Sequence, residues 1–593
     1  MKLEDFRLFD LLHNLKQMPL KEDALAAKEN GVWRKYSTQE YIDTVNYISY
    51  AFIDMGIKPG DKIGLLSNNR PEWNFVDYAC LQTGAINVPL YPTISEHDLK
   101  YIIQDAEIKY FFVANEALYN KVKACSEDIV IKEIFTFTNE GTKNLKQLIE
   151  LGKNNPQEKK LEEIKASIKN TDLATLIYTS GTTGNPKGVM LSHKNFISNV
   201  IGTLDLCPFK NSWRALSFLP LNHVLERMVA YLYTSIGLSV YYAESIETIG
   251  DNLKEVKPQM FVTVPRLLEK VYEKIVATGS SLTGIKKLLF FWALNLGLRY
   301  ELHRANGWWY EFQLKIANKI IFKKWREALG GNIVGIVCGG AALQPRLARV
   351  FHAAQIKVLE GYGLTETAPV ISVNNYADEN IKFGTVGPII HNVQVKIAED
   401  GEIYAKGANV MLGYFKQPEL TKEVIDADGW LHTGDIGIIE DGKFLKITDR
   451  KKEIFKTSGG KYITPQAIEN KLKESRFIEQ AMVIGENQKF PAAFIVPAFA
   501  FLKEWCVKHQ ITYTTNEEMV KTKVIIDRIM KEVEVANESL AQYEKIKKIA
   551  LFPREWTIDR GEMTPKLSLK RKVIFISNKD AYDEIYKIDN LYI

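Results

Sequence analysis

Short apolar runs alternate with amphipathic stretches along much of the first 360 residues, and this rhythm most narrowly limits the folds open to the chain. Strand-like runs at residues 61–67, 86–91 and 109–114 alternate with helix-like stretches at 39–56 and 70–84. Parallel strands need a crossover connection, which is usually a helix, so a chain of βαβ units shows this alternation of strand-like and helix-like segments. The sequence therefore predicts an α/β fold with doubly wound sheets.

The pattern of strand-like and helix-like segments changes along the chain. The alternation resumes after residue 200, but residues 380–450 contain short β-like runs and turns, which predict a small β layer. The following residues are rich in Lys and Glu with an α+β pattern. Because 593 residues exceed what one hydrophobic core serves, we expect a large domain at 1–450 and a smaller mobile α+β domain at 451–593.

The overall charge gives no reason to expect a nucleic acid polymer as partner. The chain has 77 Lys and Arg against 72 Asp and Glu, a net charge of +5. Its five cysteines are scattered without a C-x-x-C pair, which favours free thiols in a reducing compartment. The charged N-terminal segment lacks the apolar core of a secretory signal, so we expect a cytoplasmic protein.

The segment "YTSGTTGNPKG" at residues 178–188 follows a strand-like run. Its glycines let backbone N–H groups converge, its hydroxyls add donors and its lysine adds charge, which favours a polyphosphate site over an ordinary polar turn. A P-loop is excluded because two residues separate Gly184 from Lys187. The candidate phosphate-binding residues are Thr179, Ser180, Gly181, Thr182, Thr183, Gly184 and Lys187.

Other clusters carry reactive or hydrogen-bonding groups. Residues 360–369, "EGYGLTETAP", place Tyr362 close to Thr365 and Glu366 after a strand-like run, and "GWLHTGDIG" places Asp435 in a turn. Taken singly, Asp435 could cap a turn and Glu366 could begin a helix. Two further segments, "TDRKKEIFK" and "VCGGAALQP", contribute basic residues and paired glycines, and "FLPLNHVLERM" contributes His223, which alone is more typical of a protein core.

Together these segments resemble the adenylate-forming enzymes, the superfamily of acyl-CoA synthetases and firefly luciferase. The likeness covers nearly the whole chain. "FLPLNHVLERM", "TVPRLLEKVYEKI" and the long insert at 276–330 look most like long-chain fatty-acyl-CoA synthetases. The resemblance implies ATP-dependent activation of a long-chain fatty acid to acyl-CoA through an acyl adenylate, with release of AMP and pyrophosphate. ATP, CoA and fatty acid would be substrates and Mg²⁺ the cofactor.

The resemblance also implies a role for each matching residue. The glycine and threonine loop with Lys187 would hold the β and γ phosphates of ATP, Tyr362 would stack on adenine and Thr365 would contact the α phosphate. Glu366 would hold Mg²⁺, which suits a hard cation. The remaining implied roles are ribose binding by Asp435 with Arg450 beside it, acyl binding by His223, Gly339, Gly340 and Ala341, hinge motion at Lys452 and thioester formation near Lys456.

The chain departs from the family pattern near its C terminus. The segment reads "TPKLSLKRK", so Ser568 stands where the family presents an adenylation lysine. Lys566 and Lys570 lie two positions away on either side, and residues two apart share a face of an extended segment. We therefore expect Lys566 or Lys570 to serve in adenylation.

Two apolar stretches, at 228–243 and 288–298, are shorter than the roughly 20 residues that span a membrane. The second precedes a basic amphipathic stretch, in which one helical face carries Lys315, Lys319, Lys323 and Arg326. Another face of the same stretch carries the apolar residues Leu314, Ala317, Ile321, Trp325 and Ala328. This face is either solvated or attracted to anionic lipid, which would place the protein peripherally on the inner membrane face.

Two other functions remain open from the sequence. The chain could be an adenylating ligase for another carboxylic acid or for a carrier-protein thiol, although no carrier domain is evident and the aromatic, apolar insert favours an apolar substrate. It could also be a catalytically impaired nucleotide-binding relative, for which Ser568 is the only support.

Overall fold

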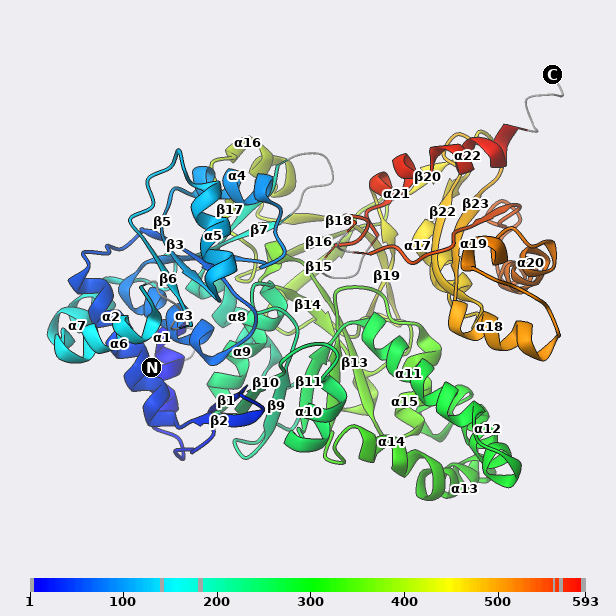
Figure 1. Ribbon diagram of the computed structural model, residues 1–593, viewed down its shortest axis with the longest axis horizontal. Coiled ribbons are helices and arrows are strands. Elements are labelled where there is room, and N and C mark those ends of the chain that lie inside the picture. Colours follow the sequence, from blue (N-terminus) through cyan, green and yellow to red (C-terminus); the bar gives the residue numbers. More distant parts are fainter. Residues whose placement is uncertain (1–4, 139–142, 180–184, 558–559, 565–568, 588–593) are drawn as a thin grey trace.

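The computed structural model describes residues 5–138, 143–179, 185–557, 560–564 and 569–587. Two large sheets and a small β layer make up the first 450 residues, and a smaller α+β unit lies at the upper right of Figure 1. The predicted α/β class and the doubly wound sheets are confirmed.

The larger sheet, within the described residues, has the order β14-β13-β12-β11-β9-β10-β1-β2. Its inner strands run parallel, whereas β14 and β2 pair antiparallel at the two edges. The strands are β1 (Leu25–Glu29), β2 (Val32–Tyr36), β9 (Arg214–Ser217), β10 (Ser239–Tyr242), β11 (Met260–Thr263), β12 (Gly335–Cys338), β13 (Lys357–Gly363) and β14 (Val370–Val373).

The second sheet has the order β17-β8-β7-β4-β3-β5-β6 in the part of the chain described. The run from β7 to β6 is parallel, and β8 pairs antiparallel with β7 and with β17. The strands are β3 (Lys62–Leu66), β4 (Ile86–Leu90), β5 (Ile108–Val113), β6 (Glu133–Thr136), β7 (Leu173–Thr179), β8 (Lys187–Ser192) and β17 (Gly413–Tyr414).

The predicted β layer is an antiparallel sheet of β15 (Val393–Ile397), β16 (Glu402–Gly407), β18 (Leu431–Glu440) and β19 (Phe444–Arg450). Beyond it come the hairpin β20 (Phe455–Lys456) and β21 (Tyr462–Ile463), then the sheet β22 (Ile478–Ile484), β23 (Ala492–Pro497) and β24 (Ile549–Leu551). Helices of this unit include α17 (Pro465–Leu472), α18 (Phe499–Lys508), α20 (Lys523–Asn537), α21 (Arg571–Ser577) and α22 (Lys579–Tyr586).

Helix ends follow local sequence signals. Helix α2 (Thr38–Asp54) begins where the Ser37 hydroxyl accepts the N–H of Glu40 at 3.1 Å, and α3 (Pro71–Thr83) begins with a proline at its first position. Helix α9 (Val224–Ile236) stops at Gly237, whose φ of +74° suits glycine. The apolar run at 228–243 is therefore a helix followed by strand β10.

Helix α9 connects the two large sheets through buried polar groups. Arg227 on α9 is fully buried and donates to the Asp77 carboxylate on α3 and, at 2.6 Å, to the Thr175 hydroxyl on β7. Tyr231 on α9 donates to the other oxygen of Asp77 at 2.6 Å. One residue before Arg227, the Glu226 carboxyl group accepts a hydrogen bond from Ser217 on β9, so neighbouring residues of one helix bond to both sheets.

Candidate nucleotide and acyl site

A tyrosine, an aspartate and an arginine meet where β13 approaches the β layer. The Tyr362 hydroxyl donates to Oδ2 of Asp435 at 2.6 Å, and Nε of Arg450 lies 3.4 Å from Oδ1. Asp435 and Arg450 are cross-strand partners on β18 and β19. Sheet pairing thus brings Asp435 and Arg450 together, and Tyr362 on β13 reaches Asp435 across 73 residues of sequence.

The two charged groups of this cluster differ in exposure. Asp435 is 4% exposed, whereas the Arg450 side chain is 57% exposed. Burial raises the pKa of the Asp435 carboxyl, and Arg450 and the Tyr362 hydroxyl oppose that rise. A buried carboxylate with one cation at 3.4 Å is well suited to accept further hydrogen bonds from a ligand's hydroxyl groups.

Thr365 and Glu366 lie on a short 3₁₀ turn, Thr365–Thr367, between β13 and β14. Amide groups of Asn199 and Asn409 donate to the backbone oxygen of Thr367 at 3.2 and 3.1 Å, which fixes the turn. Thr365 is buried and Glu366 is half-buried, so the carboxylate of Glu366 remains accessible.

Tyr414 on β17 joins Glu366 to the phosphate-loop segment. Its hydroxyl donates to Oε1 of Glu366 at 2.9 Å, and Nζ of Lys187 lies 5.4 Å from the centroid of its ring. Sequence reasoning missed Tyr414, because the segment "GYF" has no hydroxyl cluster, charge or glycine repeat of its own. Its only signal is a tyrosine after a glycine in the turn-rich region.

The phosphate-loop segment is described at its two ends. Thr179 ends β7, Lys187 begins β8, and these two residues are antiparallel partners. Ser180, Gly181, Thr182, Thr183 and Gly184 lie outside the described residues. Lys187 therefore stands at the base of a hairpin next to Tyr414 and Glu366.

The predicted acyl-binding residues come from two loops that meet. His223 caps α9, where its Nδ1 accepts the N–H of Leu225 at 3.1 Å. A Cβ added to Gly339 would lie 3.4 Å from Leu225, so the loop that carries Gly339, Gly340 and Ala341 packs against the start of α9. Buried Glu360 accepts the N–H of Leu343 in the same region, and burial raises its pKa to about 8.

The predicted C-terminal residues lie after β19 and before α21. Lys452 and Lys456 are exposed after β19, and Nζ of Lys456 lies 4.6 Å from the centroid of the Tyr462 ring. Lys570 precedes α21, and its N–H donates to the backbone oxygen of Glu562 at 2.8 Å. Lys566 and Ser568 lie outside the described residues.

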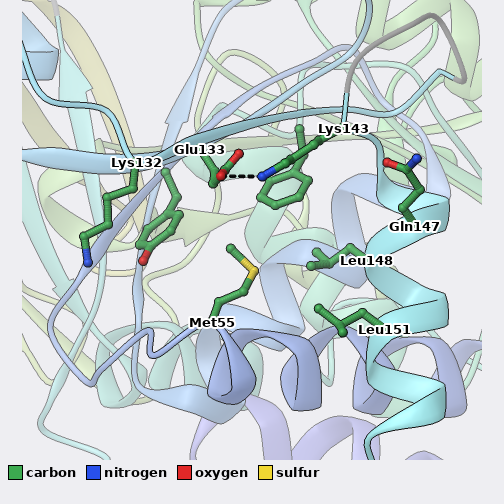
Figure 2. Close-up of a pocket in the computed structure, with 9 residues that line it drawn as sticks. Met55, Lys132, Glu133, Lys143, Gln147, Leu148 and Leu151 are labelled. Atoms are coloured by element: carbon green, nitrogen blue, oxygen red, sulfur yellow. Dashed lines mark hydrogen bonds and ion pairs between the residues drawn. The ribbon is translucent and has the colours of Figure 1, made fainter.

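The described residues contain no cluster of three or more His, Cys, Asp or Glu that could enclose a metal ion. A cavity of about 470 Å³ opens between the β5–β6 edge and α6 (Leu145–Asn154), with an ion pair between Lys143 and Glu133 at its rim (Figure 2). None of the predicted site residues lines it. The candidate site is therefore the convergence of loops around Tyr362, Asp435, Glu366 and Lys187.

Comparisons with known proteins match AMP-binding enzymes over most of the chain. A protein-family model described as an AMP-binding enzyme matches residues 13–415, and one described as an AMP-binding enzyme C-terminal domain matches 452–590. Long-chain-fatty-acid–CoA ligase FadD15 of Mycobacterium bovis is 32% identical over 565 residues, covering 94% of this chain and 93% of that protein. Human long-chain-fatty-acid–CoA ligase 1 is 31% identical over 598 residues, covering 93% and 82%.

Solved structures show the same fold. The adenylation domain of a carboxylate reductase from Mycobacterium chelonae superposes with a TM-score of 0.76 at 20% identity, covering 98% of this chain and 91% of that one. o-Succinylbenzoate coenzyme A synthetase from Bacillus subtilis, in complex with ATP and magnesium ion, gives a TM-score of 0.67 at 19% identity, covering 95% and 98%. At these identities the likeness establishes the adenylate-forming fold.

Proposed function

The chain belongs to the AMP-binding enzyme family, and from this premise we propose that it is a long-chain fatty acid–CoA ligase. In the first step the fatty carboxylate attacks the α phosphorus of ATP and pyrophosphate leaves. In the second step the thiol of CoA attacks the acyl adenylate and AMP leaves. The conversion is needed because a carboxylate is a poor electrophile.

The observation that carries the proposal is the convergence of Glu366 and Lys187 on Tyr414, next to the segment that contains Tyr362. In the first step negative charge builds on phosphate oxygens, and a fixed cation with aligned donors stabilises it. Lys187 supplies the cation at the base of the proposed phosphate loop. Thr365 follows Tyr362 by three residues and would face the α phosphate.

The donor set at Glu366 fits Mg²⁺. This ion is usually held by one or two carboxylates together with substrate phosphates and water, so a single accessible carboxylate is sufficient. Glu366 would hold the ion against the phosphates, where it would neutralise charge on the leaving pyrophosphate. The Tyr414 hydroxyl occupies one oxygen of Glu366 and orients the other.

Asp435 would accept the two ribose hydroxyls, with Arg450 beside it and the Tyr362 ring against adenine. Its buried carboxylate is incompletely compensated by Arg450 at 3.4 Å. Two donated hydrogen bonds from a ribose would offset the desolvation that raises the pKa of Asp435.

The acyl chain would enter between the start of α9 and the loop after β12, at His223 and Gly339 to Ala341. Lys452 would act as the hinge, Lys456 would serve the thioester-forming step, and Lys566 or Lys570 would contact the carboxylate and α phosphate. The domain boundary at 450/451 belongs to the same proposal. Because the substrate partitions into lipid, peripheral membrane attachment is expected as well.

Pyrophosphate release measured with palmitate, with acetate and without acid tests the proposal. We expect release with palmitate only, and AMP formation that then depends on CoA. Acetate-dependent release would favour a short-acid ligase, and silence with every acid would favour an impaired relative. Lys566→Ala and Lys570→Ala, made separately, test the lysine assignment, since unchanged pyrophosphate release in both would overturn it.

A further inference from the structure

Helices α12 (Gly284–Leu298) and α13 (Trp308–Ala317) lie at the lower right of Figure 1. Together with the adjoining π-helical turn Asn318–Phe322 they carry an exposed apolar surface. Trp308 is 80% exposed and Phe312 is 52% exposed, which is unusual for large aromatic side chains. We call this the α12–α13 surface, and its exposed apolar residues are Ile285, Leu288, Leu289, Trp308, Trp309, Phe312, Ile316 and Ile320.

The exposed residues form a second apolar face in addition to the face that packs into the core. Trp308, Phe312, Ile316 and Ile320 are spaced four residues apart and so lie along one side of the helix. The opposite side carries Tyr310, Leu314 and Ala317, which are buried, and the Tyr310 hydroxyl donates to the backbone oxygen of Leu296 on α12. Core packing therefore already has its own residues, and the outer stripe serves another contact.

The same segment is much more basic than the chain as a whole. Residues 284–328 contain nine Lys and Arg against three Asp and Glu, a net charge of +6, whereas the whole chain has +5. Lys315 and Lys319 are exposed and lie on the same helical side as the apolar stripe, and Lys286 is exposed on α12. Apolar anchors and cations therefore share one surface.

We propose that the α12–α13 surface docks onto an anionic lipid bilayer. The aromatic and aliphatic side chains enter the boundary between headgroups and acyl chains, and the lysines face lipid phosphates. Tryptophan suits this depth because its ring is apolar while its N–H remains hydrogen-bonded to water or headgroups. No helix within the described residues is long and apolar enough to cross a membrane, so this contact is interfacial.

Charge selects the lipid surface over a second copy of the chain. A symmetric dimer through this surface would bring two segments of +6 against each other, which opposes association. A bilayer with anionic headgroups complements that charge and also accepts the apolar stripe. The inference goes beyond ligase activity, and its binding test does not require the enzyme to be active.

Flotation of the full chain with two kinds of vesicles tests this surface: phosphatidylcholine alone, and phosphatidylcholine with phosphatidylglycerol. We expect binding to the mixed vesicles that weakens as salt is raised. Trp308→Ala combined with Phe312→Ala should weaken it by roughly a hundredfold through lost apolar burial. Lys315→Gln combined with Lys319→Gln should weaken it about thirtyfold on mixed vesicles.

Lys159→Gln combined with Lys160→Gln is the matched control, because these exposed lysines lie on α7 (Glu158–Ser167) at the far left of Figure 1. The control should bind like the wild type. Unchanged binding of the Trp308 and Phe312 variant would overturn the proposal. The proposal would also be overturned if the wild type formed a dimer that did not bind vesicles and if the Trp308 and Phe312 variant were monomeric.

Acyl-CoA formation from albumin-bound fatty acid should be unchanged in all variants. If the wild type formed no acyl-CoA, that result would count against the ligase activity alone.

Discussion

Two groups of the same three residue types occupy different places in this protein. At the junction between the sheets, Asp77 is bonded by Arg227 and Tyr231. At the nucleotide site, Asp435 is bonded by Tyr362 and approached by Arg450. Both aspartates are buried and both tyrosines donate at 2.6 Å. The arginines differ, because Arg227 is fully buried whereas the Arg450 side chain is 57% exposed.

The difference lies in how completely the ionic groups are satisfied. Arg227 donates to Asp77, Thr175 and Tyr231, and Asp77 also accepts from Asn87 at 2.7 Å. Asp435 has one close side-chain donor and one cation at 3.4 Å. The same residue types thus stabilise the fold where the bonds are complete and remain available to a ligand where they are not.

Arg227→Ala should have the largest effect, a loss of about 3–5 kcal/mol in the free energy of unfolding, because it leaves Asp77 buried without its cation. Urea unfolding measures it. Asp77→Asn with Arg227→Met, which removes both charges, should cost less than Arg227→Ala. If Arg227→Ala lost less than about 1 kcal/mol in the free energy of unfolding, the distinction between the two groups would fail.

Asp435→Ala should leave the free energy of unfolding nearly unchanged but should lower kcat/KM for ATP. Losing two hydrogen bonds to a charged acceptor costs about 3 kcal/mol, or roughly a hundredfold in kcat/KM for ATP. Steady-state kinetics with ATP varied, together with thermal unfolding, separates the two effects. An Asp435→Ala protein that unfolds as readily as Arg227→Ala would mean that the second group is structural too.

Glu226→Gln, next to Arg227 in the buried junction, should change how the stability of the protein depends on pH. Burial raises the pKa of Glu226 from its ordinary 4.5 to about 8, so the folded chain keeps a proton that the unfolded chain releases between these values. Wild-type stability should therefore fall across this window relative to Glu226→Gln, by about 1.4 kcal/mol per pH unit. Urea unfolding of both proteins at several pH values measures the slope, and parallel curves would contradict the assignment.

Tyr414→Phe should have the smallest effect, because it removes only the hydroxyl that orients Glu366 and leaves the ring beside Lys187. We expect the Mg²⁺ concentration for half-maximal rate to rise about tenfold. The KM for fatty acid should not change. Pyrophosphate release in a magnesium titration measures the shift, and an unaltered titration would exclude Tyr414 as a positioning residue.

Strand positions were predictable because buried parallel strands appear as short apolar runs, and 61–67, 86–91 and 109–114 correspond to β3, β4 and β5. The residue types around Tyr362 and Asp435 were predictable from the motifs. Their contact was not, since it depends on the approach of β13 to β18 across 73 residues.

Other features lacked any local signal. Arg227 lies in the largely apolar segment "VLERMVAYL". The spacing of charged residues in this segment does not indicate that Arg227 is fully buried. Along 308–328 the basic stripe was predicted, but Arg326 instead turns inward to donate to Asn318 and Ala354, and Ala328 is exposed. The outer apolar stripe was missed because the inner stripe already accounted for a helix.

The charge of the α12–α13 segment also affects how the molecule behaves in an electric field. Residues 284–328 carry a net charge of +6, and residues 451–593 contain 25 Lys and Arg against 20 Asp and Glu, a net charge of +5, so the remainder of the chain carries −6. The basic isoelectric point, about 8.5, therefore arises from these two segments. On a cation-exchange resin the protein should be retained through both of them, while the acidic remainder of the chain is repelled.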